Sequence, residues 1–246
     1  MLAAVDILAR GEAMVRIVED PDLAARLADR QREIAAIWQE ARQRQPTLFD
    51  APLPHYLGLT AVGAGTELRA ARIRFSQLYA ARRHPEWGLG LLPVGVSGAT
   101  VSRNGQVVLA RRSPTVSLYP DHWELAPSGH LCPTGEGPGV LDHRPGLLEE
   151  LEQELGLTGD RVQETATLGI LRDNQAAVVD VCCLLRVRAT ARDIEQALAS
   201  AACSREYTAI SFLPLSELSA FATAADSLVP TSRVLLRLIA AALAGG

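Results

Sequence analysis

The segment LLEELEQELGL, residues 147–157, places several acidic side chains within three helical turns. On a helix of about 100° per residue, Glu150, Gln153 and Glu154 share one narrow face. Glu150 and Glu154 are four residues apart, so their carboxylates repel each other, and a divalent cation would turn that repulsion into ligation. Taken alone, the segment is more typical of an ordinary acidic amphipathic helix. Its surroundings must decide between the two interpretations.

The elements around this helix are those of a layered α/β domain. Asn104-Gly105 lies between two apolar runs and predicts a β-hairpin with a type I′ turn. A glycine at position 129 and a long proline- and glycine-rich loop then lead to the acidic helix, where Gly156 predicts a left-handed cap. Further strands are expected at 165–172, 176–189 and 208–215, and helices at 190–200, from 216, and at 231–244.

The N-terminal part of the chain has a different pattern. Apolar residues at helical spacing predict a helix over residues 22–44, begun by Asp20 or Asp22. Alternation predicts a strand over 67–75, and a short helix should follow and stop at Pro85. We therefore expect a mixed α/β extension over residues 1–92 that packs on a core domain over residues 93–246.

From residue 93 to about residue 225 the sequence resembles the Nudix hydrolase family, whose box reads G-x5-E-x7-R-E-U-x-E-E-x-G-U, with U aliphatic. Gly129 stands at the opening glycine, and Glu150 and Glu154 stand at two of the box glutamates. Leu151, Gly156 and Leu157 match the positions between and after them. NGQVVLARR resembles the family's first hairpin, and REYTAISFLPLSEL resembles its late strand-to-helix passage.

The sequence also departs from the box. Glu149 replaces its arginine, Gln153 replaces the first glutamate of the pair, and the loop after Gly129 is six residues longer. The N-terminal region and the expanded loop after SGHLCP resemble a Nudix subgroup that hydrolyses UDP-sugars. This resemblance implies a Nudix-type α/β/α sandwich with a mixed β-sheet.

The same resemblance implies metal-dependent hydrolysis of a nucleoside diphosphate linked to another group, such as a UDP-sugar or an ADP-ribose-like compound. The expected cofactor is Mg²⁺ or Mn²⁺, held by Glu150, Glu154 and the neutral oxygen of Gln153. Glu154 and Glu206 are the expected catalytic residues, with Glu206 a candidate base that could equally be an exposed loop charge. The residues expected to bind substrate are Arg112, Arg69, Gly129 and His130.

Two other functions remain open from the sequence. The changed box positions favour a Nudix-fold module that binds or senses a nucleotide without cleaving it. The third alternative is an α/β scaffold whose acidic helix is only a solvated face. Under this alternative, the resemblance of the hairpin, Gly129 and the later strands to the Nudix pattern would be a coincidence.

The composition of the chain argues against nucleic acid and membranes as partners. The 246 residues carry a net charge of −4, which provides no bulk attraction for nucleic acid or anionic lipid. No apolar run approaches a membrane span, and we expect no signal peptide. The four cysteines include no C-x-x-C pair, which favours reduced thiols in a cytoplasmic protein. The apolar stripe at 23–38 could serve a homodimer.

Overall fold

The structure is a computed structural model that describes residues 3–133, 135, 137–200 and 206–244. The chain divides into two compact units. The first contains Met1–Ala13, Gly95–Gly129 and His143–Gly246, and the second contains Met14–Val94 and His130–Asp142. A division at Val94/Gly95 lies close to the expected boundary at 92. The contacts also group the first residues of the chain with the first unit and the loop 130–142 with the second. Whether 1–92 and 93–246 are separate domains stays a prediction.

The first unit is built on one large β-sheet. Its strand order is β1 (Val5–Arg10), β10 (Val162–Asp173), β11 (Val178–Val187), β5 (Val94–Val101), β6 (Gln106–Arg112) and β12 (Tyr207–Pro214). Two short strands, β7 (Trp123–Leu125) and β8 (Ser128–His130), pair with β6 and β5. The long β10–β11 pair carries side chains of Ile170, Leu171, Val181 and Cys182 with no exposed surface. The central strands of this sheet are therefore buried on both faces.

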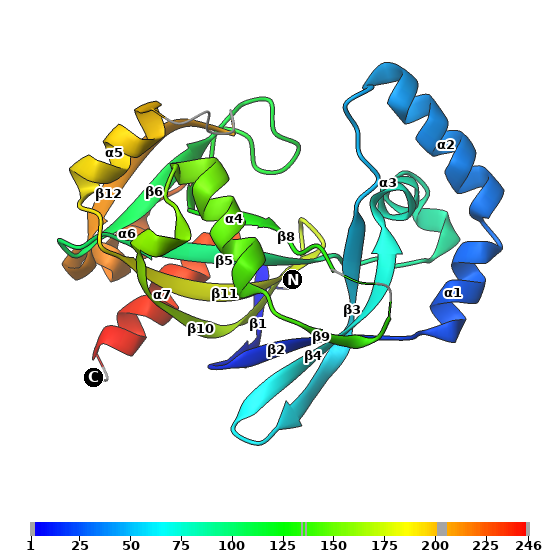
Figure 1. The fold of residues 1–246 in the computed structure, drawn as a ribbon, viewed down its shortest axis with the longest axis horizontal. Coiled ribbons are helices and arrows are strands. Elements are labelled where there is room, and N and C mark those ends of the chain that lie inside the picture. Colours follow the sequence, from blue (N-terminus) through cyan, green and yellow to red (C-terminus); the bar gives the residue numbers. More distant parts are fainter. Residues whose placement is uncertain (1–2, 134, 136, 201–205, 245–246) are drawn as a thin grey trace. The chain divides into compact units, whose positions relative to one another are not determined.

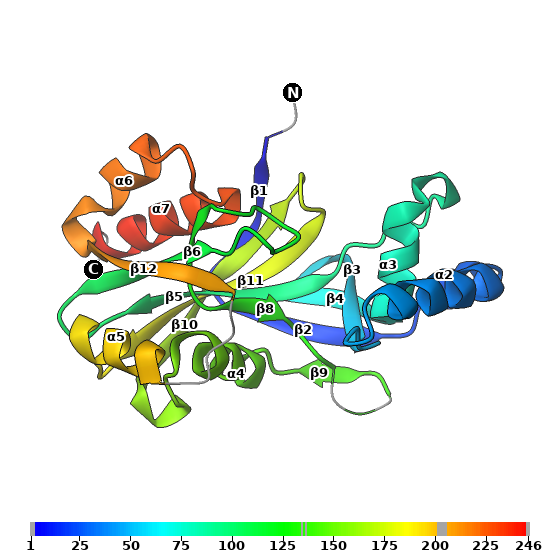
Figure 2. The same cartoon turned by 90° about the horizontal axis from the view of Figure 1, so that it is seen from above.

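Helices cover both faces of the sheet. Figure 2 shows α4 (Arg144–Leu155) and α5 (Ala191–Ser200) on one side, and α6 (Leu218–Ala224) and α7 (Pro230–Ala244) on the other. Leu218, Leu235, Leu236 and Ile239 from the second pair pack into one apolar cluster with Val107, Leu109 and Leu171 of the sheet. The expected α/β/α sandwich is confirmed, because each helix buries an apolar stripe on one side of the sheet.

The hairpin at Asn104-Gly105 is confirmed, but its expected type I′ turn is wrong. Gly105 has a φ of 72°, whereas Asn104 is absent from the described non-glycine residues with positive φ. The Gly105 N–H donates to Ser102 O at 3.0 Å, and the Ser102 N–H donates to Gln106 O at 2.8 Å. A longer turn with one left-handed glycine therefore closes the hairpin.

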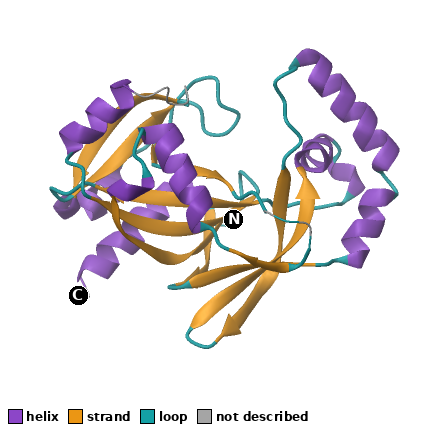
Figure 3. Ribbon diagram, in the orientation of Figure 1, coloured by secondary structure: helices purple, strands orange, loops and turns teal. Residues whose placement is uncertain are grey.

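The second unit has a smaller sheet with the order β3 (Pro52–Val62), β4 (Gly65–Arg74), β2 (Ala13–Val18) and β9 (Gly139–Leu141). Its helices are α1 (Pro21–Ala28), α2 (Gln31–Arg44) and α3 (Phe75–Arg83), with a short 3-10 turn at Pro85–Trp87. The strand expected at 67–75 and the helix ending before Pro85 are confirmed. Both appear in Figures 1 and 3.

The single helix expected over 22–44 is wrong, because it is two helices. Asp20 caps the first one, with its Oδ1 accepting the Leu23 N–H at 2.9 Å, as expected. The chain leaves helical geometry at Arg30, which has φ −106° and ψ 6°. Leu23 and Leu27 of α1 and Ile34 of α2 pack in one cluster. The bend lets both helices bury their apolar stripes in the same core.

Three of the four cysteines lie in the described residues. Cys182 and Cys183 are buried and Cys132 is exposed, and all three are free thiols. The fourth, Cys203, lies outside the described residues. Among the helices that the structure describes, none has the length and apolar character to cross a membrane.

His55 makes the stability of the second unit depend on pH. Its side chain is buried, and its Nδ1 lies 2.9 Å from Leu92 N and 3.2 Å from Leu92 O, so the tautomer decides whether that nitrogen accepts or donates. Burial lowers the pKa of His55 below its ordinary value of 6.5. The folded state therefore binds fewer protons than the unfolded state, and this stability is present above pH 6.5 and lost as the pH falls through the lowered pKa.

We expect thermal unfolding of the wild type to shift to lower temperature as the pH falls from about 7 to 5. His55→Gln, which does not titrate, should flatten that dependence while lowering the midpoint at pH 7. Circular dichroism melts at half-unit pH steps would measure both effects. Parallel curves for the two proteins would show that His55 does not cause the dependence.

Candidate functional site

Helix α4 presents an acidic residue to the core of the first unit. The helix has Pro145 in its first turn and ends at Gly156, which has the expected left-handed cap with φ 68°. Leu147, Leu151 and Leu155 have no exposed surface. Glu154 lies on the same buried side with 1% exposure. The helix is therefore no solvated acidic face, because burial of an unneutralised carboxylate is costly.

One carboxylate oxygen of Glu154 is held and the other is not. Its Oε2 accepts the Ser128 backbone N–H at 3.0 Å and the Tyr207 hydroxyl at 2.9 Å. Its Oε1 is buried and has no hydrogen-bond partner in the described part of the chain. Burial, helped by the charges of Glu124 and Glu150, raises the pKa of Glu154 to about 9. Only a proton or a cation can offset this charge at neutral pH.

Glu150 lies directly over the backbone of Gly129. A Cβ added at Gly129 would overlap the Glu150 side chain from Cγ to Oε1. Only glycine leaves this space at position 129. Burial, with the charges of Glu206 and Glu149, raises the pKa of Glu150 to about 7. Gly129, which was expected to bind substrate, thus makes room for a carboxylate.

A third carboxylate, Glu124 on β7, is buried beside these two. It forms an ion pair with Arg112 Nη1, and Arg112 Nε donates to Leu118 O at 2.9 Å. Burial raises the pKa of Glu124, although Arg112 and the Tyr207 hydroxyl act in the opposite direction. Neither Glu124 nor Tyr207 is among the site residues expected from the sequence. Glu124 and Tyr207 come together because β7 and β12 both pair with β6, which the spacing of residues along the chain does not indicate.

The outward face of α4 carries the two departures from the box. Gln153 Nε2 donates to Glu149 Oε1 at 3.1 Å, and both residues are exposed. Their i, i+4 bond occupies the side of the helix away from the Leu151 and Glu154 side chains. The structure therefore groups Gln153 with Glu149, and its role as a metal ligand stays a prediction.

The remaining expected site residues lie in different places. Glu206 precedes β12, where its backbone oxygen accepts the Ser113 N–H at 2.6 Å, and its charge reaches Glu150 and Glu124. Arg69 is an exposed residue of β4 in the second unit, where His130 also belongs. The carboxylate cluster of the first unit is thus Glu124, Glu150 and Glu154, with Glu206 at its edge.

A divalent cation fits this cluster through two side chains. Among the described residues no group of three His, Cys, Asp or Glu side chains is arranged to hold a metal. Two carboxylates are nevertheless enough to hold one hard cation, and Glu154 offers a buried Oε1 without a partner beside the carboxylate of Glu150. Mg²⁺ commonly binds through one or two carboxylates, with water and substrate phosphates completing its coordination.

Comparison with known proteins gives matches among solved structures only. No family model matches the sequence, and no curated protein matches it. One matching structure is a Deinococcus radiodurans protein, with 19% identity, a TM-score of 0.45, and coverage of 60% of this chain and 82% of that one. A C. elegans Ap4A hydrolase has 19% identity, a TM-score of 0.41, and coverage of 62% and 99%. A MutT NUDIX hydrolase from Burkholderia pseudomallei has 19% identity, a TM-score of 0.40, and coverage of 59% and 95%.

Gly129→Ala tests the packing of Glu150. The new methyl group must displace the Glu150 side chain, so we expect Mn²⁺ affinity to fall by at least about tenfold. Gly159→Ala is the matched control, because its methyl group would meet Leu148 Cδ1 at 3.6 Å, an ordinary contact. Electron paramagnetic resonance titration of free Mn²⁺ gives the affinity for each protein. Equal affinities for Gly129→Ala and the control would contradict this role of Gly129.

Proposed function

We propose that the first unit is a Nudix-type hydrolase that cleaves the phosphoanhydride of a nucleoside diphosphate joined to another group. The observation that carries this proposal is the buried, half-satisfied carboxylate of Glu154 beside Glu150, on the helix whose sequence resembles the Nudix box. A helix that packs Glu150 against the backbone of Gly129 and buries Glu154 on the same side is arranged to concentrate negative charge. That charge suits binding of a cation and a diphosphate together.

The proposed cofactor is Mg²⁺ or Mn²⁺, held by Glu150 and Glu154. Such an ion, when bound, neutralises the diphosphate and polarises phosphorus toward attack by water. Ser128 and Tyr207 orient Glu154 through one oxygen and leave the other for the ion. Glu206 remains the proposed base, because it is exposed and its charge is felt by Glu150.

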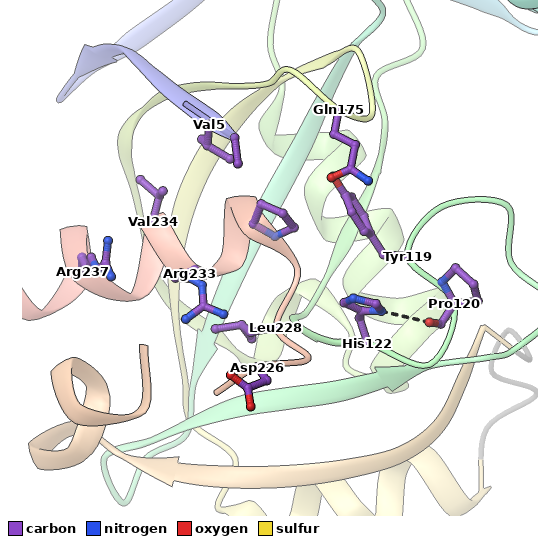
Figure 4. A pocket seen from close by; sticks show the side chains of 12 residues that line it. Val5, Tyr119, Pro120, His122, Gln175, Asp226, Leu228, Arg233, Val234 and Arg237 are labelled. Carbon is purple, nitrogen blue, oxygen red and sulfur yellow. Dashed lines mark hydrogen bonds between the residues drawn. The ribbon is translucent and has the colours of Figure 1, made fainter. Parts of the chain in front are cut away.

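A pocket in the first unit has the character expected for the nucleoside part of the substrate. It has a volume of about 630 Å³ and lies between the start of β1, the loop before β7 and helix α7. Figure 4 shows the ring of Tyr119 and the side chains of Arg233 and Arg237 along its wall. Tyr119 and His122 have ring centroids 5.7 Å apart. Aromatic rings with nearby cations and apolar walls suit a base with an attached phosphate.

Arg112 contacts one of the carboxylates and also the loop that leads into this pocket. Its guanidinium pairs with Glu124 and also holds Leu118 O, one residue before Tyr119. The Tyr119 hydroxyl is fixed in turn by Asp173 Oδ2 at 2.7 Å. We therefore propose that Arg112 positions these two groups, and its expected contact with phosphate stays a prediction. The proposed substrate is a nucleotide sugar, either ADP-ribose-like or a UDP-sugar.

The alternative of a binding module without catalysis rests on Glu149 and Gln153. Their hydrogen bond lies on the exposed side of α4, so these two changes leave the buried carboxylates in place. For this reason we propose an enzyme. A cytoplasmic homodimer stays a prediction from the sequence.

A substrate panel with matched variants tests the proposal. We expect turnover of ADP-ribose or a UDP-sugar with Mg²⁺ or Mn²⁺, and a fall of at least about a hundredfold in Glu154→Gln. Glu152→Gln, which changes an exposed acid of the same helix, should retain wild-type turnover. Phosphate released after phosphatase coupling is the measurement. Binding without turnover of any substrate would favour the binding module, and neither binding nor turnover would refute the proposal.

Replacement of Tyr119 tests the nucleoside pocket. Tyr119→Leu removes the ring and should raise KM by about tenfold with little change in kcat, the scale of one stacking contact. Tyr119→Phe keeps the ring and should keep a KM near that of the wild type. A kcat loss without a KM change in Tyr119→Leu would place Tyr119 outside the substrate pocket.

A further inference from the structure

Arg72 of β4 is a partly buried cation that has no acidic partner among the residues the structure describes. Its neighbours follow the opposite pattern, since Arg74 Nε pairs with Asp50 Oδ2 at 2.8 Å and Arg16 Nε pairs with Glu67 Oε2 at 2.6 Å. In the described part of the chain, Arg72 Nη1 donates to the backbone oxygen of Pro133, at 3.0 Å. Its Nη2 is buried and has no hydrogen-bond partner among the described residues.

This arrangement is unfavourable without a ligand. Desolvation of a guanidinium nitrogen costs free energy that a single carbonyl contact on the neighbouring nitrogen does not recover. Water could supply part of the missing hydrogen bond, but it would leave the charge unneutralised. An anion would satisfy Nη2 and the charge together.

Arg72 lines three hollows of the second unit, and two of them have further lining residues in common. One is about 420 Å³ and the other about 280 Å³, and they share Ile17, Arg72, Gly137 and Pro138. Strands β2, β4 and β9, which frame this region, belong to one sheet and lie near one another in Figures 1 and 2. In the smaller hollow Arg72 is the one charged residue among the described lining residues, and the others are apolar, glycine or proline.

The charges around the larger hollow limit what can bind. Glu19 and Asp20 line it, and Asp20 already accepts the Leu23 N–H as the helix cap. A second anionic group on the ligand would be repelled there, whereas hydroxyl groups could donate to these carboxylates. The smaller hollow is large enough for a phosphate or carboxylate group but below the usual size for a whole drug-sized ligand.

We propose that Arg72 is the anchor of a binding site for a small molecule with one oxyanion, a phosphate monoester or a carboxylate, and hydroxyl groups. The oxyanion lies on Nη2 in the smaller hollow, and the hydroxyl-bearing part extends toward Glu19. This site uses only residues of the second unit and none of the carboxylates proposed for hydrolysis. The proposed anion site can therefore be tested independently of the proposed hydrolase activity.

Calorimetric titration of the full chain with inorganic phosphate, and separately with acetate, at constant ionic strength tests the site. We expect saturable binding of at least one, and the one that binds more tightly identifies the source of the oxyanion. Arg72→Gln should weaken that binding by at least about tenfold. Arg42→Gln, which removes an exposed arginine from α2 of the same unit, should bind as the wild type does.

Hydrogen exchange of the wild-type protein keeps the test decisive if Arg72→Gln does not fold. The anion should slow exchange of backbone amides in β2, in β4 near Arg72 and in residues 137–141. Protection confined to the first unit would overturn the proposal, since the anion would then bind elsewhere. Absence of saturable binding of either anion, or equal binding by wild type and a folded Arg72→Gln, would overturn it too.

Discussion

The burial of one carboxylate, that of Glu154, is the constraint on which the first unit depends. A helix with this many leucines must pack on the sheet, and Glu154 shares the packed side with Leu151 and Leu155. The Ser128 N–H and the Tyr207 hydroxyl pay part of the desolvation cost through one oxygen. The other oxygen remains without a protein partner in the described residues. Glu154 is therefore packed against the sheet and still has one oxygen free to bind a ligand.

Residues from the neighbouring strands accommodate or offset the negative charge around Glu154. Gly129 lets Glu150 lie against the backbone of β8, and Arg112 from β6 offsets part of the charge of Glu124 on β7. Because Arg112 also holds Leu118 O, the carboxylates and the wall of the Tyr119 pocket share one anchor. A change in that anchor would alter the carboxylates and the pocket together.

The second unit also contains a buried charged group with one unsatisfied polar atom, and here the charge is positive. Its sheet and helices bury Leu53, Ile73 and Leu78 in an ordinary apolar core. Arg72 lies beside that core with half of its guanidinium satisfied, as Glu154 does in the first unit. Both groups are polar atoms in places where packing alone would favour apolar ones, which marks them as candidates for binding.

The sequence alone predicted the α/β class, the acidic helix with its Gly156 cap, the strand expected at 67–75 and found at 65–74, and the position of Glu150 and Glu154 one helical turn apart, because these depend on local periodicity and turn chemistry. It did not determine the break of the 22–44 helix, the form of the Gly105 turn or the participation of Tyr207 and Glu124. Those depend on which surfaces meet across the sheet, a property that no spacing along the chain encodes. Only the tertiary structure showed that Glu149 and Gln153 face outward as a pair while Glu154 is buried, since that choice is made by packing free energy and not by residue type.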